Sequence, residues 1–86
     1  MIVTPELRVD CPDARKFDVV AQVREHFKRT HRTIEIDGAR ILFEHGWGLV
    51  RASNTQPILV LRFEADSPAR LQEYRSLVED VVWQYL

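Results

Sequence analysis

The sequence predicts an α+β fold, a two-layer domain in which one antiparallel sheet is covered by two helices. Apolar residues recur at three- and four-residue steps in only two stretches, one near the start and one at the end of the chain. Between these stretches, segments of alternating polarity are separated by turn signals. The chain has 86 residues, which makes one domain the default. The expected order of elements is β-α-β-β-β-β-α.

The N-terminal part predicts a strand followed by a helix. Residues 6–11, "ELRVDC", predict a short strand, and Pro12-Asp13 then offers a turn and a helix N-cap. The helix is expected from Ala14 to about Lys28-Arg29, whose cations suit the negative end of the helix dipole. The residues expected on its buried face are Phe17, Val20, Val23 and Phe27.

The next two strands are expected at 33–36, "TIEI", and 39–44, "ARILFE". Asp37-Gly38 lies between them and predicts a type I′ hairpin turn, because that turn needs positive φ at both central residues. A second turn at His45-Gly46 leads into the following strand at 47–53, "WGLVRAS".

A third turn, Asn54 to Pro57, leads into the last strand at 58–65, "ILVLRFEA". Ser67-Pro68 then predicts the start of the final helix, with a hydroxyl N-cap and proline at the first helical position. The strand residues assigned to the core are Leu59, Leu61, Phe63 and Ala65. The helix residues at helical spacing are Leu71, Tyr74, Leu77 or Val78, Val81 and Tyr85.

Composition excludes several classes of protein. The net charge is −1, which does not fit a nucleic-acid or acidic-membrane binder. Cys11 is the only cysteine, so no intrachain disulfide forms, as in a reducing compartment. The N-terminus lacks the pattern of a signal peptide, and the apolar run Ile58–Leu61 is far too short to span a bilayer. A cytoplasmic location is expected.

Residues 51–55, "RASNT", collect four hydrogen-bonding side chains at one bend. The Arg51 guanidinium is a planar fork of donors that matches phosphate or carboxylate oxygens two at a time. Ser53 and Thr55 add hydroxyl donors, and Asn54 adds an amide and tolerates a left-handed backbone. Successive backbone N–H groups of a bend can also point at one anion. The set suits a phosphate monoester, although a plain turn explains the same residue types.

Other residues suggest sites more weakly. The spacings of Cys11 and the three histidines (His26, His31 and His45) match no zinc pattern, so no metal site is predicted. The basic segment 26–32, "HFKRTHR", and the aromatic residues of the strands could serve a free-standing α+β module that binds a protein or RNA. A solvated helix end and core packing explain the same features. Arg62 interrupts an apolar strand, and its role stays open.

A longer stretch around the bend resembles a known family. Residues 37–67, "DGARILFEHGWGLVRASNTQPILVLRFEADS", are similar to the C-terminal domain of bacterial phosphomannomutase/phosphoglucomutase enzymes, in the α-D-phosphohexomutase family. The likeness continues more loosely through "TPELRVDCPDARKFDVV" and the final helix, so it covers essentially the whole chain. The resemblance implies a TATA-binding-protein-like β-α-β₄-α fold, which agrees with the order of elements above.

In that family the phosphate-binding loop occupies the position of "RASNT". By this resemblance Asn54 favours the mannose/glucose subgroup, because relatives that isomerise glucosamine phosphates, and many other glucose phosphate mutases, usually carry glycine there. The resemblance implies a binding site for the non-reacting phosphate group of the substrate. The residues of this site would be Arg51, Ser53, Asn54 and Thr55.

Enzymes of this family interconvert the 1- and 6-phosphates of mannose or glucose through a bisphosphorylated intermediate. The resemblance places the catalytic phosphoserine and the magnesium ion in other domains. This chain is therefore expected to have no catalytic residue, to bind no cofactor and to be inactive alone, as one domain (1–86) of a longer four-domain enzyme. Its expected partners are the phosphate group of a hexose phosphate and the other domains of the same enzyme.

Overall fold

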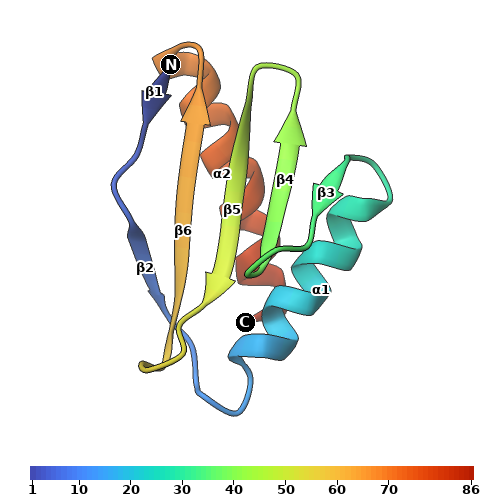
Figure 1. The fold of residues 1–86 in the computed structure, drawn as a ribbon, viewed down its shortest axis with the longest axis vertical. Coiled ribbons are helices and arrows are strands. Elements are labelled where there is room, and N and C mark those ends of the chain that lie inside the picture. Colours follow the sequence, from blue (N-terminus) through green and yellow to red (C-terminus); the bar gives the residue numbers. More distant parts are fainter.

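One antiparallel sheet forms one layer of the molecule, and two helices form the other (Figure 1). The computed structural model describes residues 1–86. The strands are β1 (Ile2–Val3), β2 (Leu7–Asp10), β3 (Thr33–Ile34), β4 (Ala39–Phe43), β5 (Gly46–Ala52) and β6 (Ile58–Ala65). They lie in the order β1-β6-β5-β4-β3, and β2 also pairs with β6. The predicted α+β class and the two-layer arrangement are confirmed.

The N-terminal edge of the sheet consists of two short strands rather than the one strand predicted at 6–11. Val3 pairs with Glu64 and Leu7 with Leu61, so three residues on the edge face two on β6. This arrangement is a β-bulge, and it contains Pro5, which has no N–H to give to the ladder. The break in the ladder divides the predicted strand into β1 and β2, and β1 was not anticipated from the sequence.

Helix α1 (Lys16–Lys28) begins later than predicted, and the prediction of Asp13 as its N-cap is wrong. The N-cap is Arg15, whose side chain accepts no hydrogen bond from the first turn. The amides of Arg15 and Lys16 donate to the Pro12 carbonyl, so a turn precedes the helix. The predicted end is confirmed, since Arg29 is the C-cap.

The buried face of α1 differs from the prediction at one position. Phe17 is 60% exposed, so its assignment to the core is wrong. The buried stripe runs along a line beside Phe17, and this leaves Phe17 on the flank of the helix. The buried residues are Lys16, Val19, Val20, Val23 and Phe27.

The turn between β3 and β4 is longer than the predicted two-residue type. Asp37 and Gly38 have φ values of 55° and 125°, so the expected positive φ is confirmed at both. However, Ile34 pairs with Arg40, whereas a two-residue turn at 37–38 would pair it with Ile41. The loop therefore includes Ile36, and β3 is shorter than predicted.

The other two turns of the sheet lie close to their predicted positions. Phe43 pairs with Gly46, so the β4–β5 turn is Glu44-His45 and not His45-Gly46. Strand β5 consequently starts and ends one residue earlier than expected. The turn from Asn54 to Pro57 and the bounds of β6 are confirmed.

Helix α2 (Pro68–Tyr85) begins as predicted, because the Ser67 hydroxyl oxygen accepts a hydrogen bond from the Arg70 amide at 3.2 Å. Between the two alternatives at 77 and 78, Val78 is buried, and Leu77 is exposed. The helix buries Tyr74, Val78, Val81 and Val82.

The two faces of the sheet differ in what covers them. Both helices pack on one side, which we call the covered face, and its fully buried side chains include Ala39, Ile41, Val50, Leu59, Leu61 and Phe63. The alternate residues of each strand point to the opposite side, the open face. By this alternation the open face carries Trp47 and four arginines, Arg8, Arg40, Arg51 and Arg62.

Candidate functional site

The four predicted phosphate-binding residues lie together at one end of the sheet. Arg51 is the penultimate residue of β5, and the other three lie in the connection to β6. The side chains of Asn54 and Thr55 are exposed and make no hydrogen bond within the chain, so their donors are free for a ligand. Ser53 is half-buried at the base of the loop.

Ser53 organises the backbone of this loop. Its hydroxyl oxygen accepts hydrogen bonds from the amides of Thr55 at 3.3 Å and Gln56 at 3.2 Å. Its own amide donates to the Ile58 carbonyl at 3.1 Å, which continues the β5–β6 ladder by one rung. Two successive backbone N–H groups therefore converge on one oxygen atom, and that oxygen belongs to the protein. The Ser53 hydroxyl proton is still available to a ligand.

Arg51 is held by a residue far away in sequence. Its Nη2 donates to Glu6 Oε2 at 3.1 Å, and the side chains of Arg51 and Glu6 are 39% and 51% exposed. Glu6 is the last residue of the bulge, directly before β2, while Arg51 lies on β5, on the far side of β6. One carboxylate occupies part of the guanidinium fork, and the remaining N–H groups can bind an anion.

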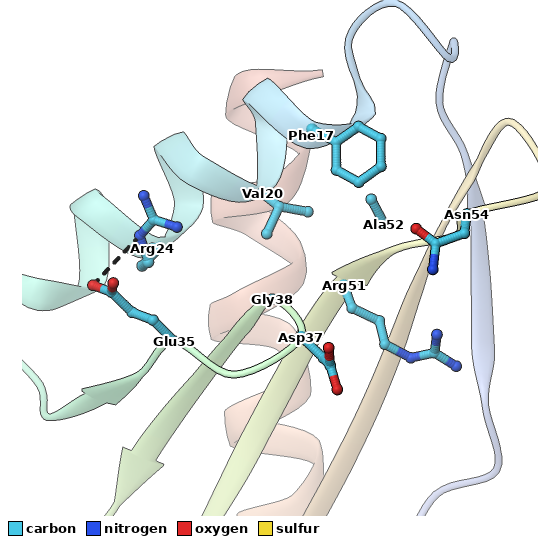
Figure 2. A pocket seen from close by; sticks show the side chains of 9 residues that line it. All are labelled: Phe17, Val20, Arg24, Glu35, Asp37, Gly38, Arg51, Ala52 and Asn54. Carbon is cyan, nitrogen blue, oxygen red and sulfur yellow. Dashed lines mark ion pairs between the residues drawn. The ribbon is translucent and has the colours of Figure 1, made fainter.

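A hollow of about 600 Å³ adjoins the loop, and Arg51 and Asn54 line it (Figure 2). Its other walls come from α1 and from the β3–β4 loop. In Figure 2, Phe17 stands at one side of the hollow, and Arg24 and Glu35 face each other at the end away from Arg51. The remaining lining residues are Val20, Asp37, Gly38 and Ala52. The exposed position of Phe17 makes it part of this wall instead of the core.

The charges at the far end of the hollow are paired. Lys28 Nζ lies 2.9 Å from Glu35 Oε1, and this hydrogen bond is the main cause that raises the pKa of Lys28 and lowers the pKa of Glu35. Arg24 Nε lies 3.6 Å from carboxylate oxygens of both Glu25 and Glu35. That Nε atom is buried and has no hydrogen-bond partner. The charges of Arg24, Lys28, Glu25 and Glu35 sum to about zero. The cationic group at the opposite end of the hollow is Arg51.

Sequence reasoning missed two residues that contact the site, Glu6 and Lys16. Glu6 binds Arg51 from 45 positions away, and Lys16 Nζ donates to the Gln56 carbonyl from 40 positions away at 3.1 Å. Both contacts depend on the register of strands and on where α1 starts. No local pattern in the sequence carries that information.

The structure disperses the residues considered for a metal site. His26 contacts Tyr85, His31 packs between Phe27 and Phe43, and His45 Nδ1 lies 3.1 Å from Asp66. Cys11 is buried, and that burial raises the pKa of its thiol. The chain has no group of three or more His, Cys, Asp or Glu residues that could hold a metal ion. These residues therefore do not fit a magnesium site.

The strand aromatics do not form an exposed stacking platform. Phe63 is fully buried, and Phe43 stacks on Tyr74 with ring centroids 4.2 Å apart. Trp47 is on the open face, but the Arg40 guanidinium lies over its ring, 4.5 Å from the centroid. Arg62 is exposed on the same face and makes no ion pair or hydrogen bond within the chain.

The fold and the loop together define a small two-layer α+β domain that presents a polar loop at the end of its central strands. Residues 6–81 match the family model described as "Phosphoglucomutase/phosphomannomutase, C-terminal domain". The chain belongs to this family, as its C-terminal domain, and the resemblance seen in the sequence is confirmed.

Individual relatives agree with this assignment. The chain is 48% identical over 77 residues to a phosphomannomutase/phosphoglucomutase of Pseudomonas putida, covering 88% of this chain and 17% of the relative. It is 40% identical over 84 residues to a phosphoglucomutase of Neisseria gonorrhoeae, covering 94% and 18%. A crystal structure of a phosphoglucomutase/phosphomannomutase family protein from Burkholderia thailandensis matches with a TM-score of 0.80 and 31% identity, over 98% of this chain and 18% of that one.

The chain thus spans less than a fifth of the length of these relatives. Neither helix is long and apolar enough to cross a membrane.

Proposed function

We propose that this chain binds the non-reacting phosphate of a hexose phosphate, through Arg51, Ser53, Asn54 and Thr55. The observation that carries the proposal is the free donor set at one loop. Arg51, Asn54 and Thr55 present side-chain donors beside an open hollow, in a chain that belongs to the phosphoglucomutase/phosphomannomutase family. A dianionic phosphate accepts several hydrogen bonds at once, and charged donors make the strongest of these.

The chemistry of the loop suits recognition of a phosphate and not of a sugar. The guanidinium of Arg51 can bind two phosphate oxygens side by side, while a hydroxyl and an amide supply single donors. None of these groups needs to distinguish sugar hydroxyls. A binding site of this kind accepts a phosphate on either end of the hexose, as interconversion of 1- and 6-phosphates requires.

The proposed role belongs to a larger enzyme in which other domains supply the catalytic phosphoserine and the rest of the substrate site. Magnesium, held by aspartates of another domain, would neutralise charge on the phosphoryl group. This chain would fix the far end of the substrate, hold the reacting end in line and help to exclude water. It would have no mutase activity alone. Asn54 favours mannose and glucose phosphates as the substrates. The proposed compartment is the cytoplasm, which fits a chain with a single cysteine.

The alternative, a free-standing module for a protein or RNA, has no specific observation in its favour. The open face lacks an accessible aromatic platform, and the basic segment 26–32 is interrupted by contacts of its histidines with Tyr85 and Phe43.

A titration of the ¹⁵N-labelled chain with glucose 1-phosphate tests the proposal. We expect saturable amide shifts confined to residues 51–56 and their neighbours, with a Kd on the order of millimolar, since one wall of a larger site binds weakly. Arg51→Ala should abolish the shifts while the remaining amide signals stay in place. Arg62→Ala is the matched control, because it removes an arginine from the same face without touching the loop. Equal binding by wild type and Arg51→Ala would refute the proposal.

A further inference from the structure

Lys16 is the one charged residue that is buried in this chain, with 5% of its surface exposed. It is the first residue of α1. Its Nζ donates to Asp13 Oδ1 at 2.8 Å and to the Gln56 carbonyl oxygen at 3.1 Å. The ammonium group therefore joins the start of the helix to the phosphate-binding loop.

The Gln56 carbonyl is a central acceptor of that loop. It accepts hydrogen bonds from the Ile58 amide at 2.8 Å and from Lys16. The neighbouring Pro57 carbonyl accepts from the Cys11 amide at 2.9 Å. The second half of the loop is thus attached to the segment that precedes α1, whereas Asn54 and Thr55 extend freely from the first half.

Packing alone does not explain a lysine at this position. Burial of an ammonium group is unfavourable unless its donors are paired, and an apolar side chain of similar length avoids that cost. Two of the three N–H donors of Lys16 are directed to specific acceptors, and one of these acceptors lies in the loop. The specific consequence of having lysine here is therefore the fixed position of the Gln56 carbonyl.

We propose that Lys16 is a positioning residue for the phosphate-binding loop. It holds the Gln56 carbonyl, and through it the turn in which Ser53 gathers the amides of Thr55 and Gln56, so that the exposed donors stay in place before a phosphate arrives. The Asp13 carboxylate, 2.8 Å away, balances the ammonium charge, so Lys16 acts on the loop through its position. This inference rests on the function proposed above.

The test compares three variants of the 86-residue chain: Lys16→Met, Arg62→Met and Arg51→Ala. Methionine keeps the length of the lysine stem and removes the charged donor. Arg62→Met is the matched control, because Arg62 is exposed on the open face and forms no ion pair or hydrogen bond within the chain. Each chain is titrated with inorganic phosphate and with glucose 1-phosphate, and hydrogen exchange of the Ile58 amide is measured without ligand.

For Lys16→Met we expect a rise in Kd of roughly fivefold to tenfold, as for loss of a charged hydrogen bond that orders a site. Exchange of the Ile58 amide should accelerate, while the β4 and β5 amides keep their protection. A purely structural role would instead change protection throughout the sheet and leave Kd unaltered for the folded fraction. Arg62→Met should match the wild type in both measurements.

The outcomes separate this inference from the function on which it rests. If Arg51→Ala abolishes binding and Lys16→Met binds as the wild type does, the positioning role is wrong and the function stands. If Arg51→Ala binds normally, the proposed function is wrong, and the role of Lys16 in phosphate binding falls with it.

Discussion

The covered and open faces of the sheet use the same strands for different purposes. Phe63 and Leu61 on the covered face are fully buried beneath the helices. Arg62, which lies between them in sequence, points to the open face and is exposed. Strand alternation directs the two sets to opposite sides of the sheet, because successive side chains point to opposite sides. Val60 is the one open-face residue of β6 that is also buried, with 5% exposed. The covered face therefore supplies stability, and the open face and its loop are free to carry charged groups.

The loop between β5 and β6, for which we propose phosphate binding, lies where these two regions meet. Arg51 projects from the open face and pairs with Glu6, whereas the loop backbone is attached to Lys16 on the covered side. Charged groups on the open face cost little because water still reaches them. The comparison predicts that neighbouring residues of one strand differ sharply in what they contribute to stability.

The largest effect is expected for Phe63→Ala. Removing a fully buried phenylalanine leaves a cavity among the helices and should lower the free energy of unfolding by about 3–5 kcal/mol. Arg62→Ala, one residue away, should change it by less than about 0.5 kcal/mol. Urea denaturation monitored by tryptophan fluorescence measures both.

Phe63→Leu keeps the experiment informative if Phe63→Ala does not fold, because a smaller loss of about 1 kcal/mol is expected for a hydrophobic replacement. Similar losses in the free energy of unfolding for Arg62→Ala and for the Phe63 variants would contradict the separation of the two faces.

Gly48→Ala probes how tightly the covered face is packed. A Cβ at this position would lie 2.9 Å from Phe63 Cε1 and 3.3 Å from Val78 Cγ2. Overpacking of this kind should lower the free energy of unfolding by about 1–3 kcal/mol, measured by the same denaturation.

The double variant Gly48→Ala with Phe63→Leu sharpens this result. The smaller leucine side chain makes room for the new Cβ. The double variant should therefore lose less free energy of unfolding than the sum of the losses in the two single variants. Additive losses would mean that Gly48 does not contact Phe63 as the structure places it.

Most of the fold could be predicted from the sequence where periodicity is strong. The bounds of β6, the Ser67 cap of α2 and the turn at 54–57 follow from alternation, capping and turn chemistry, and each is confirmed. The start of α1 was missed because Pro12 forms a turn of its own before the helix. Phe17 was misassigned because the buried stripe of α1 passes to one side of it. The bulge at Pro5 was missed because an interruption of one edge strand leaves little pattern in so short a segment.

The candidate site could be predicted only as far as one contiguous segment. Residue types and the family resemblance point to Arg51, Ser53, Asn54 and Thr55, and the structure places them side by side. The supporting contacts of Glu6 and Lys16 cross 45 and 40 positions of the chain. Their partners are set by strand register and helix placement, which no local motif encodes.

The smallest effect is expected at the exposed pair of Lys28 and Glu35. Lys28 Nζ lies 2.9 Å from Glu35 Oε1, and their side chains are 48% and 46% exposed. The hydrogen bond from Lys28 lowers the pKa of Glu35 below its ordinary value of 4.5, so the folded chain favours the ionised carboxylate. The ionised Glu35 carboxylate therefore stabilises the folded chain at pH values above 4.5. This stabilisation is lost as the pH falls through the lower pKa of Glu35 in the folded state.

Glu35→Gln should therefore be slightly less stable than the wild type at neutral pH, and the difference should disappear as the pH falls below the ordinary pKa of 4.5 and through the lower pKa of the folded state. Denaturation midpoints across that range measure it, and high salt should reduce the neutral-pH difference because the pair is exposed. Glu73→Gln is the matched control, since Glu73 is an exposed carboxylate that forms no ion pair.

If the stability difference for Glu35→Gln grew toward acid pH, the carboxylate would be unfavourable in the folded chain, contrary to its contact with Lys28. A loss in the free energy of unfolding as large as that for Phe63→Ala would show that an exposed ion pair contributes as much stability as a buried side chain of the covered face. This result would contradict the proposed difference between the two faces.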